Sequence, residues 1–178
     1  MIRYIRCTGL ALVAAQLSAC GAPPAGSAAK DPHAVQVAAA GEATCVATSS
    51  ADNMTGAAMT NTARRQAGLQ PVQPSMTLAQ VAAGHACDMA KRGRMTHIGT
   101  TTSGPGDRLR AAGYRPSISA ENIAAGPFTL NRVLTEWQTS SGHRTNILLP
   151  QVRDYGVGQA IGADGRTRYW AAVYAAPR

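Results

Sequence analysis

The sequence predicts an α+β domain in which helices cover an antiparallel sheet. Helical patterns dominate the first part of the folded region, strand-like and helical segments follow, and two strand-like segments joined by a turn close the chain. The chain has 178 residues, a length that favours one domain with short appendages. Hydrophobic residues make up 45% of it, which is enough for a buried core, although aromatic residues are only 4%.

The first twenty residues predict an export signal. A short basic stretch, residues 1–6, precedes an apolar run at 8–17, and Ser-Ala-Cys follows. Small residues before a cut site are typical of exported precursors. The apolar run is shorter than the about 20 residues that cross a bilayer, so a transmembrane anchor is disfavoured.

Leu-Ser-Ala-Cys resembles the bacterial lipobox, in which the cysteine is acylated, for example with palmitate, and becomes the new N-terminus. We therefore expect a lipoprotein signal peptide over 1–19 and a lipid on Cys20. Gly21 follows the cysteine where retained inner-membrane lipoproteins often carry Asp, which favours the outer membrane, on its periplasmic face, in a Gram-negative cell. The alternative is an ordinary signal peptide cut near Ala22 or Ala25.

Residues 20–43 predict a flexible tether between the lipid and the folded part. This stretch is rich in Ala, Pro and Gly and has no sustained period. His33 lies within it and is expected to be solvated. We expect the folded domain to occupy residues 44–178.

Four segments are predicted to be helices: 53–67, 77–92, 105–112 and 130–139. The segment at 77–92 is the clearest, because apolar side chains from Leu78 to Met89 recur at helical spacing. Gly93 follows where a helix ends. Asp52 or Asn53 is the expected cap of the first helix.

Three segments are predicted to be strands: 117–124, 154–161 and 167–175. The last two form a hairpin with a turn at 163–165. The first carries Glu121.

Cys45 and Cys87 predict a disulfide, since an even pair of cysteines in an oxidising compartment is most simply bridged. Metal binding by Cys87 with His85 and His97 is the alternative, but the paired short spacings of a structural zinc site are missing. His85 lies on the apolar stripe of its helix and is expected to be a core histidine bonded to backbone. Cys87 faces away from that stripe, toward the segment around Cys45.

The formal net charge is +8, carried mainly by scattered arginines. No aromatic residues are interleaved with them, and no nucleic-acid-binding module is present, so we expect no nucleic-acid partner. The charge is a weak argument for attraction to anionic surfaces such as lipid head groups, and a solvated basic face is the favoured interpretation. We expect a monomer.

Several short motifs occur in a fixed order along the folded region: His85-Ala86-Cys87-Asp88-Met89-Ala90, Met95-Thr96-His97, Gly106-Asp107-Arg108-Leu109, Glu121-Asn122-Ile123-Ala124, Trp137, Ser141-Gly142-His143-Arg144-Thr145-Asn146-Ile147-Leu148, Tyr155-Gly156-Val157-Gly158 and Tyr169-Trp170. Together they resemble the bacterial branch of the CAP superfamily (SCP-like; cysteine-rich secretory, antigen 5 and pathogenesis-related proteins). The resemblance covers about residues 54–175. It implies a three-layer α-β-α sandwich with a central antiparallel sheet and a cavity that holds two histidines and two acids.

The family's cavity residues correspond, by motif, to three side chains of this chain: His97, Glu121 and His143. The place of the second acid, three residues after Trp137, is taken by Ser140. Glu136 is the nearest acid, but it precedes Trp137 and should point elsewhere. The resemblance therefore implies a three-residue version of the cavity.

Two imidazoles and a carboxylate are a ligand set for a divalent metal such as zinc, so His97, Glu121 and His143 are candidate metal ligands. A buried hydrogen-bond network without metal or catalysis is the other interpretation. A hydrolase that uses Ser141 with Glu121 and His143 is the weaker alternative, because no oxyanion-binding element can be recognised in the sequence. The resemblance also implies lipid binding, known among eukaryotic relatives. We expect a membrane-anchored protein with a binding or envelope-associated role.

Overall fold

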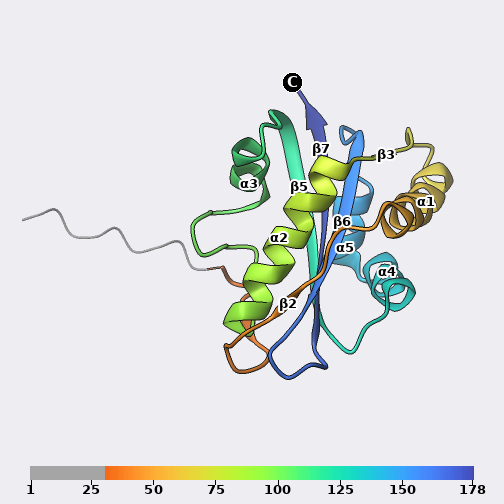
Figure 1. Ribbon diagram of the computed structural model, residues 1–178. Helices are drawn as coiled ribbons and strands as arrows, with labels where there is room; N and C mark the ends of the chain where they lie inside the picture. Colours follow the sequence, from red (N-terminus) through yellow and green to blue (C-terminus); the bar gives the residue numbers. More distant parts are fainter. Residues whose placement is uncertain (1–30) are drawn as a thin grey trace, which may run out of the picture.

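Two layers of helices enclose one central sheet in the computed structural model, which describes residues 31–178 (Figure 1). Two helices cover one face: α2 (Met76–Arg92) and α3 (Pro105–Ala111). Three helices cover the other: α1 (Ser50–Gln66), α4 (Leu130–Thr139) and α5 (Ser141–Ile147). The predicted α+β class and three-layer sandwich are confirmed. The predicted signal peptide and Cys20 lie outside the described residues.

The main sheet has the strand order β2–β6–β7–β5, with every neighbouring pair antiparallel. Its strands are β2 (Thr44–Cys45), β5 (Pro116–Gly126), β6 (Asp154–Ile161) and β7 (Arg168–Pro177). A short strand, β3 (Gln73–Pro74), pairs parallel to β6. Two further short strands, β1 (Val35–Gln36) and β4 (Arg94–Met95), pair with each other. β5 is therefore an edge strand of the main sheet.

The predicted helices and strands are all present, with small shifts at their ends. α1 begins earlier than predicted because Ser49 is its cap, and the Ser49 hydroxyl accepts a hydrogen bond from the backbone N–H of Asp52 (3.2 Å). α5 was not predicted. Only Ile147 among its seven residues is buried, so no apolar period marks it in the sequence.

α2 lies directly on the backbone of β6, which explains the two glycines of the Tyr-Gly-Val-Gly motif. A Cβ atom on Gly156 would stand 2.2 Å from the backbone of Leu78, and one on Gly158 would stand 2.3 Å from the backbone nitrogen of Ala83. Such distances are impossible for real side chains, so the close approach of helix and strand requires glycine at both positions.

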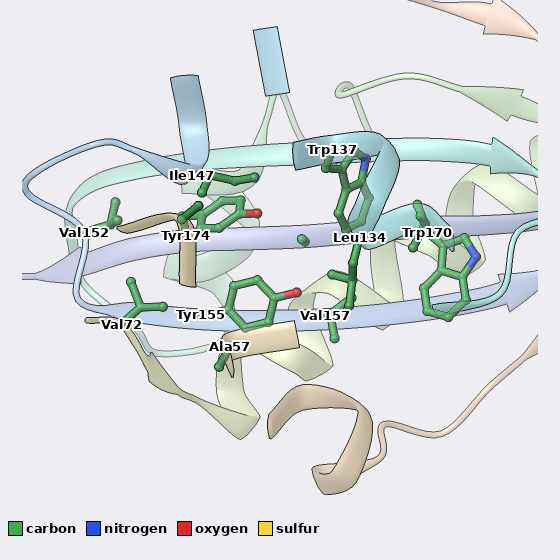
Figure 2. Close-up of a cluster of buried hydrophobic side chains, with 13 residues drawn as sticks. Ala57, Val72, Leu134, Trp137, Ile147, Val152, Tyr155, Val157, Trp170 and Tyr174 are labelled. Carbon is green, nitrogen blue, oxygen red and sulfur yellow. The ribbon is translucent and has the colours of Figure 1, made fainter. Parts of the chain in front are cut away.

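The opposite face of the sheet holds most of the large buried aromatic side chains. Figure 2 shows Trp137, Trp170, Tyr155 and Tyr174 packed together between the strands and the helices of this layer. The rings of Tyr155 and Tyr174 meet at 5.4 Å in an edge-on arrangement. The few aromatic residues of the chain are thus concentrated on one face, while alanines dominate the other.

Arg64 of α1 is fully buried and fixes the end of α5. Its guanidinium donates hydrogen bonds to the carbonyls of Ile147 (2.8 Å), Leu149 (2.8 Å) and Val152 (3.3 Å), and its Nε donates to Gln70 (2.8 Å). Backbone carbonyls therefore satisfy this buried cation. The segment that follows α5 is held against α1 by these bonds.

Cys45 of β2 and Cys87 of α2 form the predicted disulfide, with their Cα atoms 5.1 Å apart. The bond closes a sequence separation of 42 residues. It ties the first strand of the main sheet to the helix that covers it.

The second half of the predicted tether forms backbone hydrogen bonds with the domain. β1 pairs with β4, and the backbone N–H groups of Val37 and Ala38 donate to the carbonyl of Gly93 (2.9 and 3.0 Å). An Ala-, Pro- and Gly-rich composition conceals this pairing, because backbone hydrogen bonds need no side-chain pattern. None of the helices within residues 31–178 is long and apolar enough to cross a bilayer.

Candidate functional site

Glu121 and Asn122 are neighbours on the edge strand β5, and neighbouring residues of a strand point to opposite faces. Glu121 points toward α2 and α3, where it meets His85 and Arg108. Asn122 points toward α5, where it meets the backbone of His143. Both side chains are buried. The Glu-Asn motif therefore connects both helical layers to one site.

The Glu121 carboxylate is surrounded by three basic side chains. Its Oε2 accepts a hydrogen bond from Nη2 of Arg108 at 2.6 Å, and its Oε1 accepts one from Nδ1 of His97 at 2.9 Å. Nε2 of His85 lies 3.5 Å from the same Oε1. Nη1 of Arg108 also donates to the carbonyl of His97 (3.1 Å). Arg108 thus fixes both the carboxylate and the backbone of the histidine beside it.

Glu121 is ionised in this arrangement. Burial alone would raise its pKa, but the hydrogen bond from His97 and the charges of His85 and Arg108 outweigh burial, and the pKa lies below its ordinary value. Burial lowers the pKa of His85, whose Nε2–H donates to the carbonyl of Thr96 at 2.8 Å. Because an ionised carboxylate only accepts, Nδ1 of His97 carries the proton of this hydrogen bond, and Nε2 is the ring nitrogen left for the cavity.

The other side of the site is an amide network. Nδ2 of Asn122 donates to the carbonyl of His143 (3.1 Å) and to the hydroxyl of Tyr174 (3.3 Å). Nδ2 of Asn146 donates to Oδ1 of Asn122 (2.8 Å) and to the carbonyl of Glu121 (3.1 Å). These bonds fix the backbone of α5 against β5. They also cover an outward carbonyl of the edge strand, which protects it from pairing with another chain.

A cavity of about 620 Å³ lies between the two networks. It brings the three predicted residues His97, Glu121 and His143 to one place, although the Glu121 side chain is only 1% exposed. The rest of its lining is partly polar and partly apolar: Pro32, His33, Val35, Met95, Ile123, Ser140, Gly142 and Asn146. The site is thus an open cavity rather than a closed core.

The ring of His143 has no side-chain partner among the described residues. Its Nδ1 is buried without a hydrogen bond, and the ring lies at a tilt beside Trp137, 6.5 Å between centroids. Burial lowers the pKa of His143, and the charges of His97 and His33 lower it further. The backbone of His143 is therefore fixed while its imidazole remains available to a ligand.

The geometry does not match the expected three-ligand metal site. Both oxygens of Glu121 are engaged by protein donors, and Nδ1 of His97 is one of those donors. Within residues 31–178, no group of three or more His, Cys, Asp or Glu side chains is arranged to hold a metal ion. Two imidazoles fall short of the three protein ligands that a catalytic zinc site normally offers.

In this chain Ser140 stands at the position of the family's second acidic residue. Ser140 lines the cavity, and it replaces a carboxylate with a neutral hydroxyl. Ser141, the nucleophile of the hydrolase alternative, does not line it. Glu136 points away and pairs with Arg132 at 2.7 Å on the surface of α4.

Three residues that sequence reasoning gave no role in the site belong to it. Arg108 stands in a recognised motif, but its partner Glu121 lies 13 residues away and no local pattern joins them. His85 is bonded to the backbone carbonyl of Thr96, and it also lies beside Glu121. His33, expected to be solvated, lines the cavity beside His97, with ring centroids 6.4 Å apart.

Asp31 fixes the segment around His33 that lines the cavity beside His97. Its Oδ2 accepts hydrogen bonds from the backbone N–H of His97 (2.6 Å) and from the hydroxyl of Thr96 (2.7 Å), while Oδ1 accepts from the N–H of His33 (2.9 Å). Hydrogen bonds from Thr96, His33 and His97 lower the pKa of Asp31, although burial opposes them.

Comparison with known proteins agrees with the fold. The uncharacterised protein YkwD of Bacillus subtilis (strain 168) is 36% identical over 100 residues, which cover 56% of this chain and 39% of that protein. The crystal structure of an extracellular protein containing an SCP domain, from Bacillus anthracis str. Ames, superposes with a TM-score of 0.61 at 28% identity and covers 70% of this chain and 40% of that one. The chain thus spans about two fifths of either Bacillus protein.

An outer surface protein from Borrelia burgdorferi superposes with a TM-score of 0.64 at 18% identity, covering 78% of this chain and 99% of that one, a likeness of fold alone. The family model described as CAP, the Cysteine-rich secretory protein family, matches residues 57–174. That range is well over half of the sequence and contains His97, Glu121 and His143. The chain therefore belongs to the CAP (cysteine-rich secretory protein) family.

Proposed function

We propose that the chain is an exported, lipid-anchored CAP protein that binds a small polar ligand between His97 and His143. One observation carries this proposal: an open cavity of about 620 Å³ in which Glu121 is fully engaged by protein donors, while Nδ1 of His143 is buried without a hydrogen-bond partner among residues 31–178. Buried polar atoms without partners are rare in folded proteins, and a ligand is one way to satisfy them.

Glu121 acts in this proposal as a positioning residue. Its carboxylate fixes the His97 ring and keeps the proton on Nδ1, so the ligand meets an acceptor at Nε2. Asn122 positions His143 through its carbonyl and leaves the ring free. The ligand therefore offers a hydrogen-bond donor to His97, and Ser140 and Asn146 add neutral polar groups.

Export and anchoring rest on the sequence 17–20 and on relatives whose names place them outside the cell or on its surface. Mass spectrometry of the mature protein should find an acylated Cys20 at its N-terminus. In a Gram-negative host we expect it in the outer-membrane fraction. An unmodified N-terminus downstream of Cys20 would contradict the anchor.

Two imidazoles also make a divalent metal the competing occupant, with zinc as the first choice. One experiment separates the two. The exported chain carrying Cys20→Ser, which cannot be acylated, is titrated separately with glycerol and Zn²⁺ while the imidazole nitrogens are followed by NMR. A polar ligand site predicts that glycerol shifts the imidazole resonances of His97 and His143.

His143→Ala should abolish these shifts at His97. A response to Zn²⁺ alone would indicate that the cavity binds a metal ion and not a polar ligand. No response to either probe would show that the cavity is not a ligand site.

A further inference from the structure

A second concave surface lies at the end of the main sheet where β7 ends and β5 begins, beside α3. Figure 1 shows these ends of the two strands near the mark C. It has a volume of about 730 Å³. Its lining is Arg110, Gly113, Arg115, Pro116 and Arg178. Three arginines therefore line one hollow, and no acidic side chain among residues 31–178 lines it.

Two of these arginines are held side by side by the backbone. The N–H of Arg178 donates to the carbonyl of Arg115 at 3.0 Å, which extends the β5–β7 ladder one step beyond the pair Pro116 and Pro177. Like charges at opposite positions of neighbouring strands destabilise a sheet. A bound anion would turn this repulsion into attraction.

The nearby negative charge is too small to cancel the arginines. Asp107 pairs with Arg110, and its remaining carboxylate bonds go to Ser103, so it lies on the outer side of α3. Neither Arg115 nor Arg178 forms an ion pair with an acid among residues 31–178. Even with the α-carboxylate of Arg178 counted, cationic groups remain in excess.

We propose that this arginine groove (Arg110, Arg115 and Arg178) binds an oxyanion of the phosphate class. Guanidinium groups match phosphate oxygens with two parallel N–H bonds each, and arginine is always charged, so the site works at any physiological pH. The phosphate has two possible sources, free inorganic phosphate and the phosphate of an anionic lipid head group. A head group is within reach if Cys20 anchors the chain to a membrane, and the net charge, which is +6 once Arg3 and Arg6 are removed with the signal peptide, favours approach to such a surface.

The test uses the exported Cys20→Ser chain in 0.15 M salt. Isothermal titration calorimetry measures inorganic phosphate binding, and co-sedimentation measures binding to vesicles of phosphatidylglycerol mixed with phosphatidylcholine, with pure phosphatidylcholine as reference. Arg115→Gln combined with Arg178→Gln should weaken phosphate binding at least 10-fold and reduce sedimentation with anionic vesicles to the reference level.

The matched control is Arg65→Gln combined with Arg166→Gln, which removes the same charge from two exposed sites elsewhere. It should change phosphate affinity less than 2-fold. All four side chains are exposed, so folding is expected to survive, and thermal unfolding checks this. His143→Ala should bind phosphate normally.

Binding to phosphate alone, or to phosphate and anionic vesicles, supports the groove and tells which source it uses. Equal loss in the control pair would show that only overall charge matters. Loss in His143→Ala would place the anion in the cavity. Absence of phosphate and vesicle binding in the unaltered chain would overturn the proposal.

Discussion

Each side of β5 holds one histidine at the cavity, and the two sides do so by different interactions. On the α2–α3 side, Glu121 fixes His97 through an ionised carboxylate whose charge Arg108 offsets. On the α5 side, Asn122 fixes His143 through its backbone carbonyl and uses no charge. We therefore expect mutations on the charged side to lower the free energy of unfolding more than mutations on the amide side, although both sides shape one cavity.

Arg108→Met tests the charged side and should have the largest effect. It leaves Glu121 buried without a permanently charged partner, which typically destabilises by about 3–5 kcal/mol. Urea denaturation measures this loss. Adding Glu121→Gln to Arg108→Met should recover much of it, because the uncompensated charge is removed. A loss below about 1 kcal/mol for Arg108→Met would mean that the histidines alone compensate the carboxylate.

The disulfide strengthens the same side of the sheet, since it joins α2 to β2. Cys45→Ser should lower the free energy of unfolding by about 2–4 kcal/mol, through a larger entropy of the unfolded chain. Denaturation with and without a reducing agent measures this. Unfolding that does not change on reduction would contradict a role of the bond in holding the charged layer.

Asn122→Ala tests the amide side and should cost about 1–3 kcal/mol, because the hydroxyl of Tyr174 and the amide of Asn146 lose a buried partner. Asn131→Ala, on the exposed surface of α4, is the matched control and should change stability by less than about 0.5 kcal/mol. If Asn122→Ala lowered the free energy of unfolding as much as Arg108→Met, the expected difference between the two sides would be contradicted.

Glu136→Gln should have the smallest effect. Glu136 forms an exposed pair with Arg132 on one turn of α4, and such pairs contribute about 0.3–0.5 kcal/mol. The His97 and His143 imidazole resonances should not move. A shift of either resonance would contradict this and would indicate that Glu136 serves as the second acidic residue of the site.

Much of the fold follows from local patterns in the sequence. The apolar stripe of α2 and the hairpin of β6 and β7 carry their periods in consecutive residues, so both could be predicted. β1 and β4 are held by two-residue backbone pairing, and the short α5 buries only Ile147, so no periodic pattern reveals them.

The site could be predicted only in part. Family motifs indicated His97, Glu121 and His143, and the structure brings them to one cavity. The partners that decide their chemistry, Arg108 and Asp31, lie 13 and 66 residues from the groups they bind. Such long-range ion pairs and hydrogen bonds depend on packing, which a single sequence does not display.

The proton on His97 tests the central claim most directly. Long-range proton–nitrogen NMR of the imidazole rings distinguishes a neutral ring protonated at Nδ1 from one protonated at Nε2. The structure predicts that His97 is protonated at Nδ1, held by ionised Glu121, and that Glu121→Gln weakens this preference. A neutral His97 protonated at Nε2 in the unaltered chain would contradict the account, because the cavity would then present a donor where the proposed ligand needs an acceptor.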